Sequence, residues 1–106
     1  MIARLWSARA TSAQVQTYLA HFSAQVAPAL RKFKGYAGHT VFTRDASASA
    51  EICVTTYWQS MQAIEAFAGP DREAAVVAPA AAALLLEYDK RARHYEVAQS
   101  NFPAST

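Results

Sequence analysis

The chain has 106 residues, of which 53% are hydrophobic, enough for one compact domain and too few for two. Its single cysteine, Cys53, excludes an intramolecular disulfide and a thiolate metal cluster, so we expect a protein of the reducing cytoplasm. We also expect no membrane span, because no apolar run is long enough. The formal net charge is only +2, but residues 1–44 contain no acid, so this part either binds an anion or pairs with the acids from Asp45 onward.

Residues 2–9 predict an opening β-strand with two partly apolar faces. Side chains alternate along a strand, so Ile2, Arg4 and Trp6 should share one face. Arg4 has two interpretations there. It forms an ion pair with a later acid, or it is the counter-charge for an anionic ligand.

A long helix should follow, capped by Thr11 or Ser12. Pro28 falls inside it and should kink or divide it. His21 lies well off the apolar stripe, so we expect it to face solvent. The stripe follows the helical period and consists of Val15, Tyr18, Leu19, Phe22, Val26, Leu30 and Phe33.

Gly35 should end this helix in a left-handed conformation. Residues 36–44 then predict a second strand, with His39 on the opposite face from Tyr36 and Phe42. A short polar turn leads into the next strand. The second and third strands should therefore form an antiparallel hairpin.

Residues 51–57 are largely β-branched or aromatic and predict a buried third strand. The period then becomes helical within about three residues, and Ser60 is a suitable cap. Trp58 lies on this corner, where it either closes the core or lines the end of a cavity. The helical repeat that follows is formed by Met61, Ile64 and Phe67.

The last part of the chain predicts short elements and a final strand. Residues 69–71 should end the second helix and begin a short one, and residues 80–86 should add a helical turn or two. Residues 88–97 predict the last strand. Its many charges indicate a position near the edge of the sheet.

The predicted order is β-α-β-β-α-β, the α+β, ferredoxin-like arrangement with an antiparallel four-stranded sheet. The domain should cover residues 1–99, followed by a tail at residues 100–106. Both helices then lie on one face, and the open face would carry Leu5, Val41 and Cys53. We expect a second copy of the chain to cover it, giving a homodimer.

Motifs with a defined chemistry are mostly absent. Residues 34–37 match the start of an RNA-binding signature that fails after this point, so we expect no nucleic acid partner. No metal-ligand or nucleophile pattern occurs, and we predict no metal. His39 and His94 should lie near the core, where each is either structural or a base with a near-neutral pKa.

Taken together, the motifs resemble the antibiotic biosynthesis monooxygenase family over nearly the whole chain, to about residue 97. The most specific part is the strand that ends in Trp58 and Ser60 before the second helix. The other matching segments lie in the same order and spacing. They are residues 3–9, 35–38, 44–45, 51–57, 63–64, 67–69 and 94–97.

This resemblance implies a dimeric α+β barrel with an apolar cavity between helices and sheet. Relatives include cofactor-independent oxygenases of aromatic polyketides and quinols, in which a substrate anion reacts directly with O₂, and haem-degrading enzymes. Trp58 corresponds to a Trp that the haem degraders place in their pocket. They also need a helical His, which residues 73–77 lack, so the resemblance argues against haem degradation.

The sequence therefore predicts a homodimeric monooxygenase without a cofactor, acting with O₂ on a small aromatic, polyketide or quinol substrate. The alternatives are a ligand-binding protein without turnover and a non-oxidative isomerase or cyclase on the same scaffold. The predicted site consists of Trp58, Trp6 and Phe67 as apolar walls, Arg4 as anion stabiliser and His39 as base.

Overall fold

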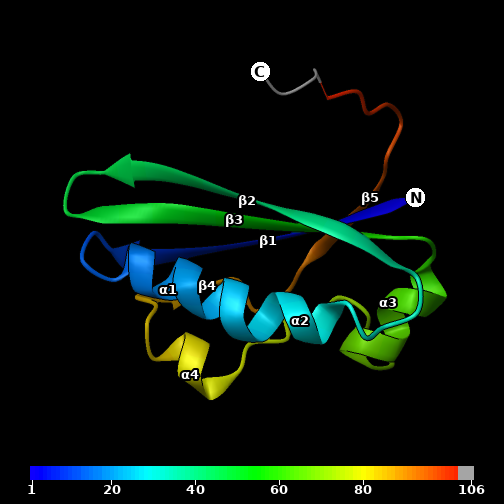
Figure 1. Ribbon diagram of the computed structural model, residues 1–106, viewed down its shortest axis with the longest axis horizontal. Helices are drawn as coiled ribbons and strands as arrows, with labels where there is room; N and C mark the ends of the chain where they lie inside the picture. Colours follow the sequence, from blue (N-terminus) through cyan, green and yellow to red (C-terminus); the bar gives the residue numbers. More distant parts are fainter. Residues whose placement is uncertain (103–106) are drawn as a thin grey trace.

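The computed structural model describes residues 1–102 of the chain. Its antiparallel sheet has the strand order β2-β3-β1-β4, and the short strand β5 pairs with the other end of β1. The helices lie against one face of this sheet (Figure 1). In chain order the elements are β1 (Ile2–Thr11), α1 (Val15–His21), the π-helical turn η1 (Phe22–Val26), α2 (Ala27–Leu30), β2 (Tyr36–Ala46), β3 (Ser49–Trp58), α3 (Met61–Ala68), α4 (Pro79–Ala82), β4 (Glu87–Tyr88) and β5 (Arg93–Glu96).

This architecture confirms the predicted α+β fold with its ferredoxin-like order of elements. The core lies between the sheet and the helices, and its largest fully buried side chains are Trp58, Ile52 and Ile64. Within residues 1–102, no helix has the length and apolar character needed to cross a membrane.

The long helix predicted after β1 is divided as Pro28 requires. Ahead of the proline, the amide of Ala27 donates to the carbonyl of Phe22, five residues back, which makes η1 a π-helical turn. Proline has no amide hydrogen, so the regular ladder cannot continue through it. The predicted caps are wrong, because the helix starts at Val15 after Gln14 and no side chain caps it.

The β2–β3 hairpin contains a register shift between Tyr36 and Gly38. One extra residue in a strand reverses the alternation of its side chains. The hydroxyl of Tyr36 therefore lies 2.7 Å from Nδ1 of His39 on the same face, and Val41 packs against the core. The prediction that His39 faces away from Tyr36 is wrong, as is the placement of Val41 on the open face.

The corner between β3 and α3 forms as predicted. Ser60 caps α3, its hydroxyl accepting a hydrogen bond from the amide of Ala63 at 3.2 Å. Gly35 has a φ of +90° and packs directly against this corner. A Cβ at Gly35 would lie 2.6 Å from Cβ of Ala63, so only glycine fits.

The segment between α3 and α4 contains no helix, so the short helix predicted after residues 69–71 is wrong. The carbonyl groups of Arg72 and Ala74 accept hydrogen bonds from the Arg4 guanidinium. Carbonyls that are bound in this way are not available for a helical ladder. One helical turn, α4, begins only at Pro79.

The predicted last strand is present as two short strands, β4 and β5, at the edge of the sheet. The amide of Asp89 still donates to the carbonyl of Ser7 in β1, but residues 90–92 pair with the α3–α4 segment instead. Ala74 and Arg91 form an isolated antiparallel bridge, and the Arg91 guanidinium binds both carboxylate oxygens of Asp71 at 2.9 Å. A nonlocal partner therefore interrupts the strand.

Charges of the two halves of the chain partly pair in the fold. Arg9 lies 2.8 Å from Glu87, and Arg44 lies 3.2 Å from Glu51. Within residues 1–102, Arg4 forms no ion pair with a carboxylate. Pairing thus explains part of the uneven charge and leaves Arg4 to be explained separately.

The predicted tail begins at residue 100. Residues 100–102 are exposed, and the chain leaves the sheet there on the side away from the helices (Figure 1). Residues 103–106 of the predicted tail lie outside the described residues.

Candidate functional site

A cavity of about 80 Å³ lies between the helices and the sheet and opens to solvent. Strands β1 and β3 form its floor, and the helical segment and residues 76–78 form its walls. The lining is mostly apolar and contains no acid and no His. It consists of Arg4, Trp6, Tyr18, Phe22, Val26, Leu30, Val54, Thr56, Phe67, Val76, Val77, Ala78 and Ala81.

The π-helical turn aligns the helical wall of the cavity. The lining residues Tyr18, Phe22, Val26 and Leu30 recur every four residues. In a regular α-helix, each step of four residues drifts by roughly 40° around the axis, so such a row would rotate away. The wider turn of η1 compensates for this drift and keeps the row on one wall.

Arg4 is the charged residue of the cavity, and it is buried, with 5% of its surface exposed. Its guanidinium donates to the carbonyls of Arg72 and, at 2.7 Å, Ala74, and lies 5.5 Å from the centre of the Phe67 ring. Burial lowers the pKa of Arg4, although a guanidinium stays charged. Its positive charge is therefore held rigidly and without a carboxylate beside an apolar space.

His94 is the second group that holds Arg4. Its Nε2 lies 2.8 Å from Nη1 of Arg4. A guanidinium can only donate, so Nε2 must accept and the imidazole is neutral. Burial, followed by the charge of Arg4, lowers the pKa of His94 and keeps it in this form.

Tyr18 brings a hydroxyl group to the cavity from α1. The residue is 3% exposed, and burial raises the pKa of its hydroxyl to about 12. Within residues 1–102, the buried polar side-chain atom that lacks a hydrogen bond is Nε2 of His21. The Tyr18 hydroxyl is not such a fully buried atom, and we find no hydrogen bond to it in this part of the chain, so it keeps some exposure, and Tyr18 lines the cavity in its protonated form.

His21 was predicted to face solvent. It is only partly exposed, and its Nε2 atom is buried. This prediction is therefore wrong for the ring nitrogen, although His21 does not line the cavity.

A family model of antibiotic biosynthesis monooxygenases matches residues 1–79 of the chain. The chain belongs to this family. The fold is shared with a candidate antibiotic biosynthesis monooxygenase from Bacillus cereus (TM-score 0.67, 15% identity, covering 99% of this chain and 98% of that one). No curated protein sequence matches the chain.

Two further solved structures share the family fold. One is a candidate antibiotic biosynthesis monooxygenase from Deinococcus radiodurans, with a TM-score of 0.61 and 16% identity over 99% of this chain and 100% of that one. The other is the haem degrader MhuD from Mycobacterium tuberculosis, solved with two haems in its active site. It has a TM-score of 0.60 and 20% identity over 96% of this chain and 100% of that one.

Of the predicted site residues in this family member, Arg4, Trp6 and Phe67 meet at the cavity. Trp58 does not reach its surface: it is fully buried and stacks on Phe67 with ring centres 5.3 Å apart. Its indole nitrogen donates to the hydroxyl of Thr56, which lines the cavity, at 2.8 Å. Trp58 thus supports the wall from behind.

His39 also lies outside the cavity lining. Its ring packs edge-on against Phe22 at 4.9 Å, so Phe22 separates it from the cavity. Burial, and next the charge of Arg31, lowers the pKa of His39. A catalytic role for His39 stays a prediction, without direct contact to the cavity.

The sequence did not predict the contact of His94 with Arg4 or the position of Tyr18 at the cavity. His94 faces Arg4 in the register of β5 with β1, and an antiparallel pairing of the last strand with the first would have brought them together. Tyr18 was identified in the apolar stripe of the helix. Its place at the cavity depends on the π-helical turn, for which the sequence has no signal beyond Pro28.

Proposed function

We propose that the protein is a monooxygenase that uses no cofactor and oxidises an electron-rich aromatic or quinol substrate with O₂. The observation that carries this proposal is Arg4, a buried guanidinium that lacks a carboxylate partner within residues 1–102 and borders an otherwise apolar cavity. Membership of a family named for monooxygenase activity supports it.

The chemistry requires an electron-rich substrate anion. A buried positive charge stabilises an oxyanion strongly because little water competes with it. The apolar walls, which include Trp6 and Phe67, desolvate and orient the ring. For a doubly benzylic methylene the overall reaction is R₂CH₂ + O₂ → R₂CO + H₂O, so one oxygen atom enters the product and no external reductant is needed.

The cavity as it stands is smaller than a single aromatic ring requires. A volume of about 80 Å³ is below the roughly 150 Å³ of a cavity that binds benzene. A ring therefore enters only if a wall moves. Residues 76–78 form the wall outside helices and strands, and Val76 is exposed, so we assign the movement to this segment.

Haem degradation, the activity named for MhuD, does not fit the residues of this cavity. Iron in haem proteins is ligated by His, Cys, Met or Tyr. Among the described residues, 1–102, Tyr18 is the only lining residue of these types, and burial raises its pKa to about 12, which disfavours the phenolate that iron requires. No step of the proposed reaction passes through haem.

A ligand-binding protein without turnover is the second candidate, because no general base lines the cavity. His39, the predicted base, lies behind Phe22. The two candidates differ in whether O₂ is consumed.

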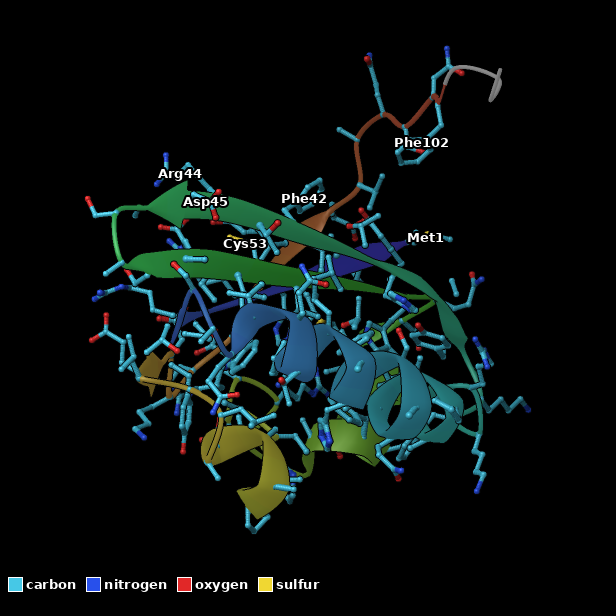
Figure 2. The ribbon with its side chains drawn as sticks, turned by 60° about the vertical axis from the view of Figure 1, so that its left-hand side comes forward. Met1, Phe42, Arg44, Asp45, Cys53 and Phe102 are labelled. Carbon is cyan, nitrogen blue, oxygen red and sulfur yellow. The ribbon has the colours of Figure 1, made fainter. Side chains whose placement is uncertain are left out.

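We also propose that a second copy of the chain covers the open face of the sheet. Phe42 and Tyr95 on this face are 58% and 50% exposed, and Leu5 lies between their strands. Figure 2 shows Phe42 projecting from the sheet on the side away from the helices. An apolar face of this kind fits a symmetric homodimer.

The oxidation proposal is tested with purified, metal-free protein incubated with a panel of anthrones and quinols under ¹⁸O₂. We expect O₂ uptake above the uncatalysed rate and one ¹⁸O atom in the product by mass spectrometry. A changed product without ¹⁸O would indicate an isomerase or cyclase. Recovery of unchanged substrate across the panel would leave only the binding function.

A further inference from the structure

The polar side chains that line the cavity all carry a hydrogen-bond donor. Arg4 can only donate, and the Tyr18 hydroxyl is held in its protonated form. The hydroxyl of Thr56 already accepts from Trp58, which leaves its hydrogen to donate. No carboxylate, amide side chain or imidazole lines the cavity, so a ligand must supply the acceptors.

We propose that the cavity takes its ligand as an aromatic oxyanion that is already ionised in solution, and that the Tyr18 hydroxyl is a second anchoring donor beside Arg4. The inference rests on the proposed function only in calling this ligand the substrate. The class comprises phenols and enolised aryl ketones that ionise near neutral pH.

Tyr18 fits this role in position and in protonation. It lies on the row of helical residues that η1 keeps on the cavity wall. The residue is buried, its hydroxyl keeps some exposure and has no hydrogen-bond partner that we can identify within residues 1–102, and burial raises the pKa of the hydroxyl to about 12. A hydrogen bond from such a group to an anion is stronger than one between neutral groups.

The lack of a base determines the form in which the ligand arrives. His94 lies beside Arg4, but its Nε2 already accepts a hydrogen bond from the guanidinium, and it does not line the cavity. His39 is screened by Phe22. Since neither imidazole reaches the cavity, the proton leaves the ligand in water before binding.

The test uses 4-nitrophenol and its neutral methyl ether, 4-nitroanisole, under anaerobic conditions. The phenolate absorbs at longer wavelength than the phenol, so its bound fraction and ionisation can be followed directly. We expect the phenolate to bind at least tenfold more tightly than the ether, and the apparent pKa of the phenol to fall as protein is added, because binding removes only the anion from solution.

Substitution of Arg4 and of Tyr18 tests the contribution of each donor to binding. Arg4→Met should abolish the preference for the phenolate, and Tyr18→Phe should weaken phenolate binding at least fivefold while changing ether binding less than twofold. Tyr95→Phe removes a hydroxyl from the other face of the sheet, away from the cavity, and should bind both probes like the wild type.

Equal binding of phenolate and ether by the wild type would overturn the inference, and so would a Tyr18→Phe variant that binds like the wild type. If Arg4→Met does not fold, these two comparisons still decide. Because binding is measured without O₂, a failure of oxidation leaves this result intact, and oxidation without a preference for the anion would refute only the inference.

Discussion

Arg4 occupies an unusual environment for a buried cation. Burying a charge is unfavourable unless hydrogen bonds compensate, and here two carbonyl groups and one neutral imidazole do so in place of a carboxylate. The charge is thus fixed in position but not neutralised. Such a preorganised charge stabilises an anion in the cavity without further rearrangement.

The neutral state of His94 makes stability depend on pH. Its pKa in the folded protein is lowered, so the unfolded chain, with a His pKa of about 6.5, binds more protons. The free energy of unfolding should therefore fall as the pH drops through this value towards the folded pKa. In urea unfolding from about pH 7.5 to about pH 5, His94→Gln should show a shallower fall than the wild type.

Glutamine is chosen at position 94 because its amide oxygen can still accept from Arg4 but does not titrate. The pKa of His39 is lowered as well, so His39→Gln should remove a separate part of the pH dependence. A wild-type profile that is flat over this range, or one that rises on acidification, would contradict the assignment of a neutral His94.

At the scale of elements, the local patterns of the sequence predicted most of the fold. The strand period of residues 51–57 and the cap Ser60 were sufficient for β3 and α3. Three of the exceptions depend on nonlocal contacts or on strand register. The bulge in β2, the break between β4 and β5, and the absent helix after Gly69 involve partners that are distant in sequence or a single extra residue in the register.

Two glycines with nearly the same φ allow the cost of backbone strain to be measured separately from the cost of a steric contact. Gly35 and Gly69 have φ values of +90° and +91°, but a Cβ at Gly69 meets nothing within 4 Å, whereas at Gly35 it would lie 2.6 Å from Ala63. Gly69→Ala should cost about 1–3 kcal/mol, because φ +91° with ψ −173° lies in a region essentially restricted to glycine. Gly35→Ala should cost about 1–3 kcal/mol more because of overpacking.

These costs are measured as free energies of unfolding from chemical denaturation of both variants. The expected order is wild type, Gly69→Ala and then Gly35→Ala. Equal losses in the two variants would mean that the contact between Gly35 and the corner of α3 adds nothing.

At the scale of the whole molecule, the open face of the sheet and the cavity lie on opposite sides. Assembly can therefore be tested separately from activity. Phe42→Asp places a charge in the proposed homodimer interface, where its burial would be costly. We expect sedimentation to show a dimer for the wild type and a monomer for this variant. Ala20→Asp, on the exposed side of α1, is the control and should remain dimeric.

A monomeric wild type, or a Phe42→Asp variant that stays dimeric, would show that the open face is not the interface. The sequence predicted this face from Leu5 and Cys53, but it placed Val41 there instead of Phe42 because the bulge in β2 was not foreseen.

The candidate site was predictable only in part. Arg4, Trp6 and Phe67 could be found from strand faces and helical spacing, and they meet at the cavity. Trp58 and His39 lie one layer behind it. Their position could not be predicted, because sequence patterns distinguish the two faces of an element but not the depth of a side chain. Tyr18 and His94 required the helical distortion and the strand register.

The most direct test of the account is the rate of O₂ uptake with an anthrone or quinol substrate by the wild type, Arg4→Met and, as a matched control, Arg31→Met, which removes an exposed arginine. The account predicts uptake by the wild type, a kcat/KM reduced at least tenfold in Arg4→Met, which is about 1.4 kcal/mol or more, and less than a twofold change in the control. Uptake by Arg4→Met at the wild-type rate, or none by the wild type, would contradict it.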